Sequence, residues 1–177
     1  MDSSSITPRP DGTYTLELSG SFPPEWMGSI CTHLGARGIS VESGFARQVE
    51  RGGWESKFVL RPLAPGIDMA QVNYRALAMV AKRPGPAARL QIKSFEVVDQ
   101  GDSLTVSIRA GDELGLLGRL LGAFTFLMLF VHEMRIETVG REAHDVFVLK
   151  GLAWMTPSEA SRQRLVASLQ AMSGGVP

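Results

Sequence analysis

The fold is decided by residues 104–149, LTVSIRAGDELGLLGRLLGAFTFLMLFVHEMRIETVGREAHDVFVL. Apolar and polar residues alternate over 104–109, which is the period of a strand with one buried face. The next apolar residues recur at helical spacing, at Leu117, Leu120, Leu121 and Phe124. A second alternation over 133–138 ends at Gly140, where the chain turns back. The segment therefore predicts the order strand, loop, helix, strand, turn and strand.

The first half of the chain repeats this plan. Residues 13–18 alternate as a strand, and an apolar helical stripe follows that stops at Gly35. Residues 39–45 alternate again, and Gly52-Gly53 suits a hairpin because glycine readily adopts positive φ. Residues 54–60 then return as the third strand, so the same strand–helix–strand–strand unit is expected twice.

The two units are expected to end differently. A helix from about residue 67 to 82 follows in the first unit, and Leu90 and Ile92 begin a fourth strand, which completes a βαββαβ unit over residues 13–98. Residues 99–177 are expected to form a second unit without a fourth strand, since few residues follow its last helix. Residues 1–12 are expected to be a flexible tail. The clean alternation predicts an α+β fold of two tandem ferredoxin-like units, with antiparallel sheets and helices on one face.

Composition argues against several classes of protein. The chain has 18 Lys and Arg against 18 Asp and Glu, so it lacks the basic excess that binds a phosphate backbone. Its longest apolar run, residues 120–131, is shorter than the roughly 20 residues that span a bilayer. The N-terminus lacks the apolar core of a signal peptide. Fourteen of the 18 cations are arginine, which fits a high-GC bacterial genome. We therefore expect a cytoplasmic bacterial protein that contacts neither membrane nor nucleic acid directly.

The sequence shows no constellation typical of catalysis or metal binding. Cys31 is the single cysteine, which excludes an intrachain disulfide and a cysteine cluster. Cys31 and His33 lie about 200° apart around a helix and cannot pair as nucleophile and base. His132 and His144 could meet across a hairpin, but two histidines alone make a poor metal site. We therefore expect no enzyme, no cofactor and no metal.

Residues 114–149 resemble the ACT domain, a family of ligand-sensing regulatory modules. The resemblance rests on His132, Thr138, Gly140 and the triplet Asp145-Val146-Phe147. The segment is similar in particular to the ACT repeats at the C-terminus of the bacterial uridylyltransferase that senses nitrogen status. Residues 13–60 fit the same pattern more weakly, so the resemblance implies a tandem ACT protein without an attached enzyme.

The resemblance also implies a ligand site. ACT domains hold small ligands, usually amino acids, at an interface between domains, on the loop before the first helix and at the start of the second strand. In the second unit these positions are Asp112, Glu113, Leu114, Gly115, Leu116 and Phe130. The Asp and Gly of the family loop are present there, its Pro is absent, and Phe130 replaces a polar residue. A helix N-terminus at such a loop suits a carboxylate.

The first unit carries the complementary pattern. Its loop, Ser21–Glu25, has neither the Asp nor the Gly, whereas Ser40 supplies the polar residue at the start of the second strand. The alternative that both loops are plain strand-to-helix connections stays open.

The sequence thus predicts a non-catalytic regulatory protein that binds a small metabolite, an amino acid, and signals to a protein partner. The alternative is a ligand-free module whose sheets serve only in assembly. Asp112 and Gly115 favour the first reading, and Phe130 favours the second. Because such sheets leave an open face and unpaired edges, we also expect a homodimer or an internal pseudo-dimer of the two units.

Overall fold

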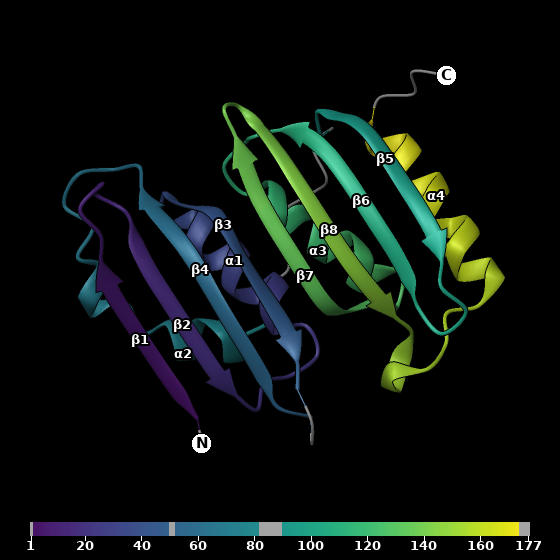
Figure 1. Cartoon of the computed structure of the whole chain (residues 1–177), viewed down its shortest axis with the longest axis horizontal. Helices are drawn as coiled ribbons and strands as arrows, with labels where there is room; N and C mark the ends of the chain where they lie inside the picture. The colour runs from purple at the N-terminus through teal and green to yellow at the C-terminus, as the bar shows by residue number, and fades with distance from the viewer. Residues whose placement is uncertain (1, 50–51, 82–89, 174–177) are drawn as a thin grey trace.

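The computed structural model describes residues 2–49, 52–81 and 90–173, which form one antiparallel sheet with helices on a single face (Figure 1). The strand order is β1-β2-β4-β3-β7-β8-β6-β5. In chain order the elements are β1 (Ser3–Pro8), β2 (Tyr14–Gly20), α1 (Trp26–Ala36), β3 (Ile39–Gln48), β4 (Trp54–Pro62), η2 (Met69–Gln71), α2 (Tyr74–Met79), β5 (Ile92–Asp99), β6 (Leu104–Gly111), α3 (Leu116–Phe126), β7 (Phe130–Val139), β8 (Glu142–Lys150), η3 (Leu152–Trp154) and α4 (Glu159–Met172).

The sheet consists of two similar halves that pack as an internal pseudo-dimer. Each half contains four neighbouring strands, and the halves join where Ser43–Arg47 of β3 pairs antiparallel with Glu133–Glu137 of β7. Helices α1 and α3 pack against each other behind this junction (Figure 1). The predicted fold class, α+β with two tandem ferredoxin-like units and helices on one face, is confirmed.

The outer strand of each half differs from the prediction. The sequence predicted that this strand comes last in the first unit and is missing from the second, whereas β1 and β5 each come first in their half. All six residues of β1 pair with β2, so the prediction of a flexible tail over 1–12 is wrong for Ser3–Pro8. Leu90 and Ile92 lead into β5, which pairs with β6 of the second half and does not complete the first. The second half therefore does have a fourth strand. Each edge strand pairs with the strand that follows it in the chain, because only a short turn separates the two.

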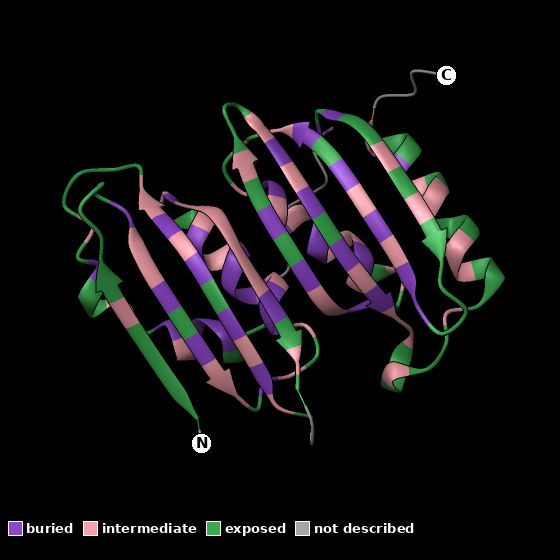
Figure 2. Ribbon diagram, viewed as in Figure 1, coloured by how far each residue is buried: buried purple, intermediate pink, exposed green. Residues whose placement is uncertain are grey.

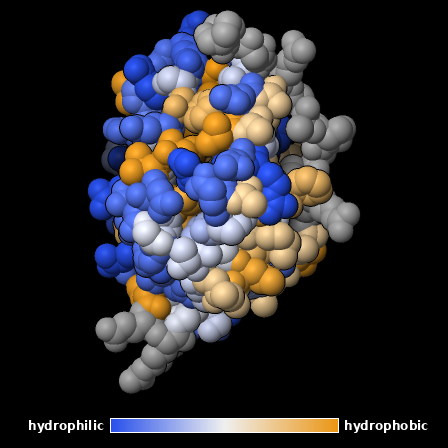
Figure 3. Space-filling model, turned by 90° about the vertical axis from the view of Figure 1, so that its right-hand side faces the viewer, coloured by the Kyte–Doolittle hydropathy of each residue, from blue (hydrophilic) through white to orange (hydrophobic). Residues whose placement is uncertain are grey.

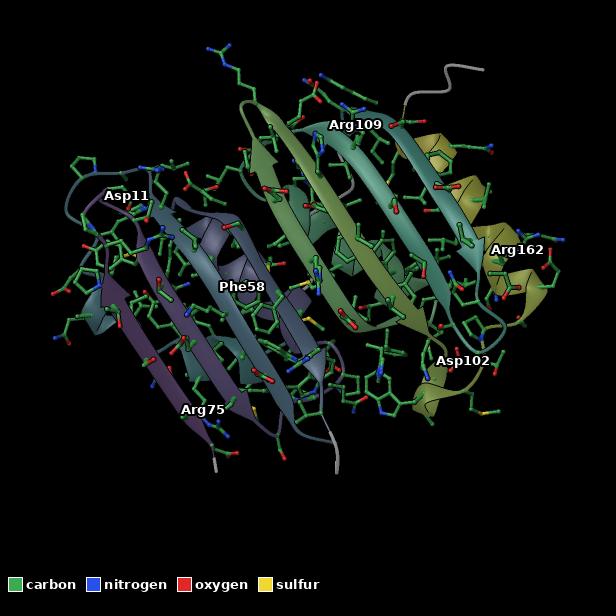
Figure 4. All side chains as sticks on the ribbon, viewed as in Figure 1. Asp11, Phe58, Arg75, Asp102, Arg109 and Arg162 are labelled. Atoms are coloured by element: carbon green, nitrogen blue, oxygen red, sulfur yellow. The ribbon has the colours of Figure 1, made fainter. Side chains whose placement is uncertain are left out.

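This hairpin pairing bears on where the chain divides. The boundary expected between residues 98 and 99 falls at the end of β5, inside the β5–β6 hairpin. We propose that the two domains divide before β5, between α2 and β5. Asp11 and Asp102 then occupy equivalent turns, at the tips of β1–β2 and β5–β6, toward opposite ends of the sheet (Figure 4).

The second helix of the first half is shorter than predicted. In place of one helix over residues 67–82, the structure has the 3-10 turn η2 and the six-residue α2, and residue 82 lies outside the described residues. The side chain of Asp68 accepts a hydrogen bond from the Ala70 N–H, and that of Asn73 accepts one from the Ala76 N–H. These two caps start separate short helices, because Asp and Asn compete with the backbone for helical donors.

Buried and exposed residues alternate along the strands, as the sequence pattern requires (Figure 2). The buried side chains form one apolar core between the sheet and the helices, in which the larger members include Trp26, Trp54, Phe58, Phe124 and Phe147. On the side of the molecule that carries β5 and α4, hydrophobic groups lie interspersed among hydrophilic ones (Figure 3). Within the described residues, no helix combines the length and apolar character that crossing a membrane requires.

The two central helices meet through glycine. A Cβ atom added at Gly118 of α3 would lie 2.7 Å from Thr32 Oγ1 and 3.0 Å from Thr32 N on α1. Gly118→Ala is therefore expected to lower the free energy of unfolding by about 1–2 kcal/mol, since the helices must move apart. In an uncrowded helix the same change would raise stability by about 1 kcal/mol, so urea unfolding tests the sign of the effect.

Gly28 of α1 is the matched control, since it occupies the same third position as Gly118 in its helix. A Cβ atom at Gly28 would meet nothing nearer than Leu121 Cβ at 3.4 Å, an ordinary contact. Gly28→Ala should leave stability unchanged or raise it. Equal effects of the two substitutions would contradict close packing at Gly118.

Candidate functional site

A crevice lies where the two halves meet, at the end of the junction that contains the start of β3. The first half contributes α1 and β3, and the second contributes the β6–α3 loop, the first turn of α3, β7 and β8. Its lining residues are Cys31, Gly35, Ile39, Ser40, Val41, Glu42, Asp112, Glu113, Leu114, Gly115, Leu116, Leu117, Gly118, Ile136, Glu137, Thr138, Ala143 and Asp145. Its free volume is ≈ 30 Å³, which is room for very few water molecules.

The loop before α3 is held in a defined conformation. The Asp112 N–H donates to the Arg141 carbonyl oxygen at 3.0 Å, and Arg119 pairs with Glu113 at 2.9 Å. Gly115 precedes the helix with φ +83°, a left-handed conformation that favours glycine. The Leu116 N–H donates to the Glu113 carbonyl oxygen, and the Arg119 N–H donates to that of Gly115. The backbone N–H groups between them, in the first turn of α3, have no acceptor within the helix. The loop thus presents the positive end of α3 to the crevice.

Carboxylates face this helix end from both halves. Asp145 is 5% exposed, and burial raises its pKa to about 7, with a smaller opposing contribution from the Glu137 N–H and a raising one from Asp112. Burial also raises the pKa of Asp112, and the carboxylate of Glu42 across the crevice adds to that shift. Both carboxyl groups therefore bind protons more readily than exposed ones do.

Two further acidic groups of the crevice are already paired. Glu42 forms a bidentate pair with Arg61, and Glu113 pairs with Arg119. Among the described residues that line the crevice, none is Lys, Arg or His. Glu137 lines the crevice as well. Asp112, Glu137 and Asp145 thus remain as groups that a cationic atom in the crevice could neutralise.

The structure brings together five of the six residues that the sequence indicates. Asp112, Glu113, Leu114, Gly115 and Leu116 all line the crevice. Phe130 does not: it lies at the start of β7, opposite Lys150, and is 9% exposed. The expectation that Phe130 shares a wall with this loop is therefore wrong. The start of the second strand that meets the loop comes from the other half and carries Ser40.

Asp145, Glu42 and Cys31 also line the crevice and were not among the predicted site residues. Asp145 had a detectable signal, because it occupies a core position of its strand, between the buried Ala143 and Phe147. While it stays buried, the Cys31 thiol is poorly reactive, since burial raises its pKa to about 12. Within the described part of the chain, no three His, Cys, Asp or Glu side chains converge as ligands of one metal ion.

Comparisons with known proteins give a partial match. Over 78 residues, 44% of this chain, the sequence is 38% identical to the bifunctional uridylyltransferase/uridylyl-removing enzyme of Nitrosospira multiformis, of which the match covers 8%. The crystal structure of aspartate kinase from Synechocystis gives a TM-score of 0.49 at 13% identity, over 91% of this chain and 27% of the kinase. No family model matches. The chain thus spans less than a tenth of the curated relative, with which it shares a homologous segment.

Proposed function

We propose that this is a non-catalytic, cytoplasmic regulatory protein of the ACT type, whose crevice binds an amino acid and passes the binding event to a protein partner. The observation that carries the proposal is the composition of the crevice. It joins the N-terminus of α3 and the acidic residues Asp112 and Asp145 of the second half to the start of β3 in the first half. The homology to part of a uridylyltransferase supports an ACT-type role, and similarity to its C-terminal repeats in particular stays part of the proposal.

The chemistry of the crevice matches a zwitterion. The ligand carboxylate would accept hydrogen bonds from the first-turn amides of α3, with Gly115 allowing close approach. The ligand ammonium would lie near Asp112 and Asp145, favouring their ionised forms. Ser40 adds a hydroxyl from the first half.

Binding in this crevice would change how the halves meet. A free volume of ≈ 30 Å³ is too small for an amino acid, so binding must move the loop or widen the junction. A ligand that favours the widened arrangement shifts the population toward it. This shift is the signal that a partner would read.

Replacing Gly115 tests the proposal most directly. Thermal-shift measurements and calorimetry with the twenty amino acids would first identify a binder, since a ligand specific to the folded state raises its stability. Gly115→Val is then expected to abolish detectable binding, because valine resists φ +83° and its side chain would occupy the approach to the amides.

Gly101→Val is the matched control. Gly101 has φ +88° and nothing within 4 Å of an added Cβ, and it lies in the β5–β6 turn, outside the crevice. Gly101→Val imposes a backbone strain similar to that of Gly115→Val and should leave amino-acid binding unchanged. Equal loss of binding in both variants would assign the Gly115 effect to general destabilisation.

The second candidate function is a ligand-free assembly module. The small free volume of the crevice favours it. Flat calorimetric traces for all twenty amino acids with the wild-type protein would decide in its favour.

A further inference from the structure

The junction between the halves has two ends that correspond by internal symmetry but carry different side chains. Helices α1 and α3 each span 11 residues, and β3 and β7 carry bulges at equivalent places, Val41/Ser43 and Val131/Glu133. Aligning these features gives the equivalent pairs Phe22 and Asp112, Trp26 and Leu116, Trp54 and Ala143, and Phe130 and Ser40. In every pair the larger aromatic residue lies at the end away from the crevice.

Aromatic contacts cross the junction at that end. The rings of Trp54 in the first half and Trp154 in the second lie 6.0 Å apart, and Trp154 meets the His132 ring edge-on at 5.9 Å. His132 Nδ1 lies 3.0 Å from Gln48 Oε1, a hydrogen bond between β7 and β3. The cluster continues into the first half, where Trp26 packs on Trp54 and Phe22 stacks on Trp26. We call this set the aromatic end.

The backbone near Trp154 is strained in a way that positions its ring. Ala153 and Trp154 have φ values of +53° and +62°, which non-glycine residues rarely adopt. Such strain persists only where surrounding contacts stabilise it. Backbone hydrogen bonds within residues 151–155 and the ring contacts of Trp154 with Trp54 and His132 together stabilise this turn.

Among the described residues, the crevice end has no ring contact and no side-chain hydrogen bond between the halves. Glu42 corresponds to His132, and Thr138 corresponds to Gln48. Glu42 pairs with Arg61 of its own half instead of bridging to the other. Across the crevice it faces Asp112, a like-charged group. Hence ring contacts and a side-chain hydrogen bond join the halves at one end, whereas the other end contains a small crevice lined in part by acidic residues.

We infer that the junction is hinged at the aromatic end and opens at the crevice end only. Native fluctuations open a protein first where few apolar contacts and bonds must break. The inference concerns the protein without a ligand and holds whether or not an amino acid binds. It also means that the loop Ser21–Glu25, at the aromatic end, is closed by the protein's own side chains.

The single cysteine provides a probe for this motion. Cys31 lines the crevice and is 4% exposed, so a disulfide reagent such as DTNB reaches it only when the crevice opens. Its equivalent at the aromatic end is Leu121, which is 3% exposed. The double variant Cys31→Ala/Leu121→Cys moves the probe to that end. Each rate is divided by the rate of the same chain unfolded in urea, and circular dichroism checks the fold.

Cys31 is expected to react at least about tenfold faster than the cysteine introduced at residue 121. Its rate should change little at low urea, because local opening exposes little surface, whereas the rate at residue 121 should rise with the full slope of global unfolding. Equal rates, or the global slope at both positions, would overturn the hinge.

Hydrogen exchange on the wild-type protein tests the same point without a substitution. Residues 39–42 and 129–132 are equivalent stretches that lie outside the β3–β7 pairing, one at each end. Exchange should be faster over 39–42 than over 129–132. The reverse order would place the opening at the aromatic end and refute the inference.

Discussion

Asp145→Asn is expected to make the protein less dependent on pH, with a difference from wild type of about 4 kcal/mol in unfolding free energy between pH 4 and pH 8. The pKa of Asp145 is raised from 3.8 to about 7 in the folded protein, chiefly by burial. Between these values the folded state holds a proton that the unfolded state has lost, so stability falls as pH rises. The loss begins near pH 4 and is complete once the pH has passed 7.

Urea unfolding at several pH values measures this difference. The cost of burying an asparagine amide does not depend on pH, so it cancels when the two pH profiles are compared. Asp102→Asn is the control, because hydrogen bonds from Lys150 and Ser103 hold the pKa of Asp102 below its usual value. The contribution of Asp102 to stability is lost only as the pH falls below about 4, so this variant should follow wild type between pH 4 and pH 8. Parallel profiles of wild type and Asp145→Asn would show that Asp145 is ionised throughout.

Gly44→Ala is expected to lower the free energy of unfolding by about 3 kcal/mol or more. Gly44 lies in β3 between β4 and β7, where it pairs with Phe58 and Ile136. An added Cβ would lie 2.3 Å from the Lys57 carbonyl oxygen and 2.8 Å from Phe58 Cα, and φ is +151°. Both contacts are with backbone in the middle of the sheet, so neither can yield without shifting a strand.

Gly140→Ala separates strain from collision. Gly140 has φ +66° in the β7–β8 turn, but nothing lies within 4 Å of an added Cβ. Its substitution should cost only about 1 kcal/mol. Urea unfolding of both variants makes the comparison, and an equally small effect at Gly44 would mean that the strands adjust around it.

The candidate site could be predicted from the sequence only in part. The loop Asp112–Leu116 was identifiable, because a glycine and acidic residues ahead of an apolar helix form a local pattern. Its partner was not, because Ser40 is distant in the chain and comes from the other half. The sequence instead pointed to Phe130, the equivalent residue of the same unit. The internal symmetry explains this error. The start of β3 meets the loop of the second half, so the strand start that lies beside a loop belongs to the other half and not to the same unit.

The sequence by itself determined most of the local elements: the strands other than β1, the central helices and the helix-facing side of those strands, because period and turn chemistry act between near neighbours. It also determined the α+β class and the repetition of the unit. Only the tertiary structure decided which strands pair at the edges and that the two halves share one sheet. Only it decided that large aromatics close one end of the junction while Asp112, Ser40 and Asp145 line the other. Pairing and packing depend on the path of the whole chain and on which side chains fill a shared space, and neither is encoded within any one segment.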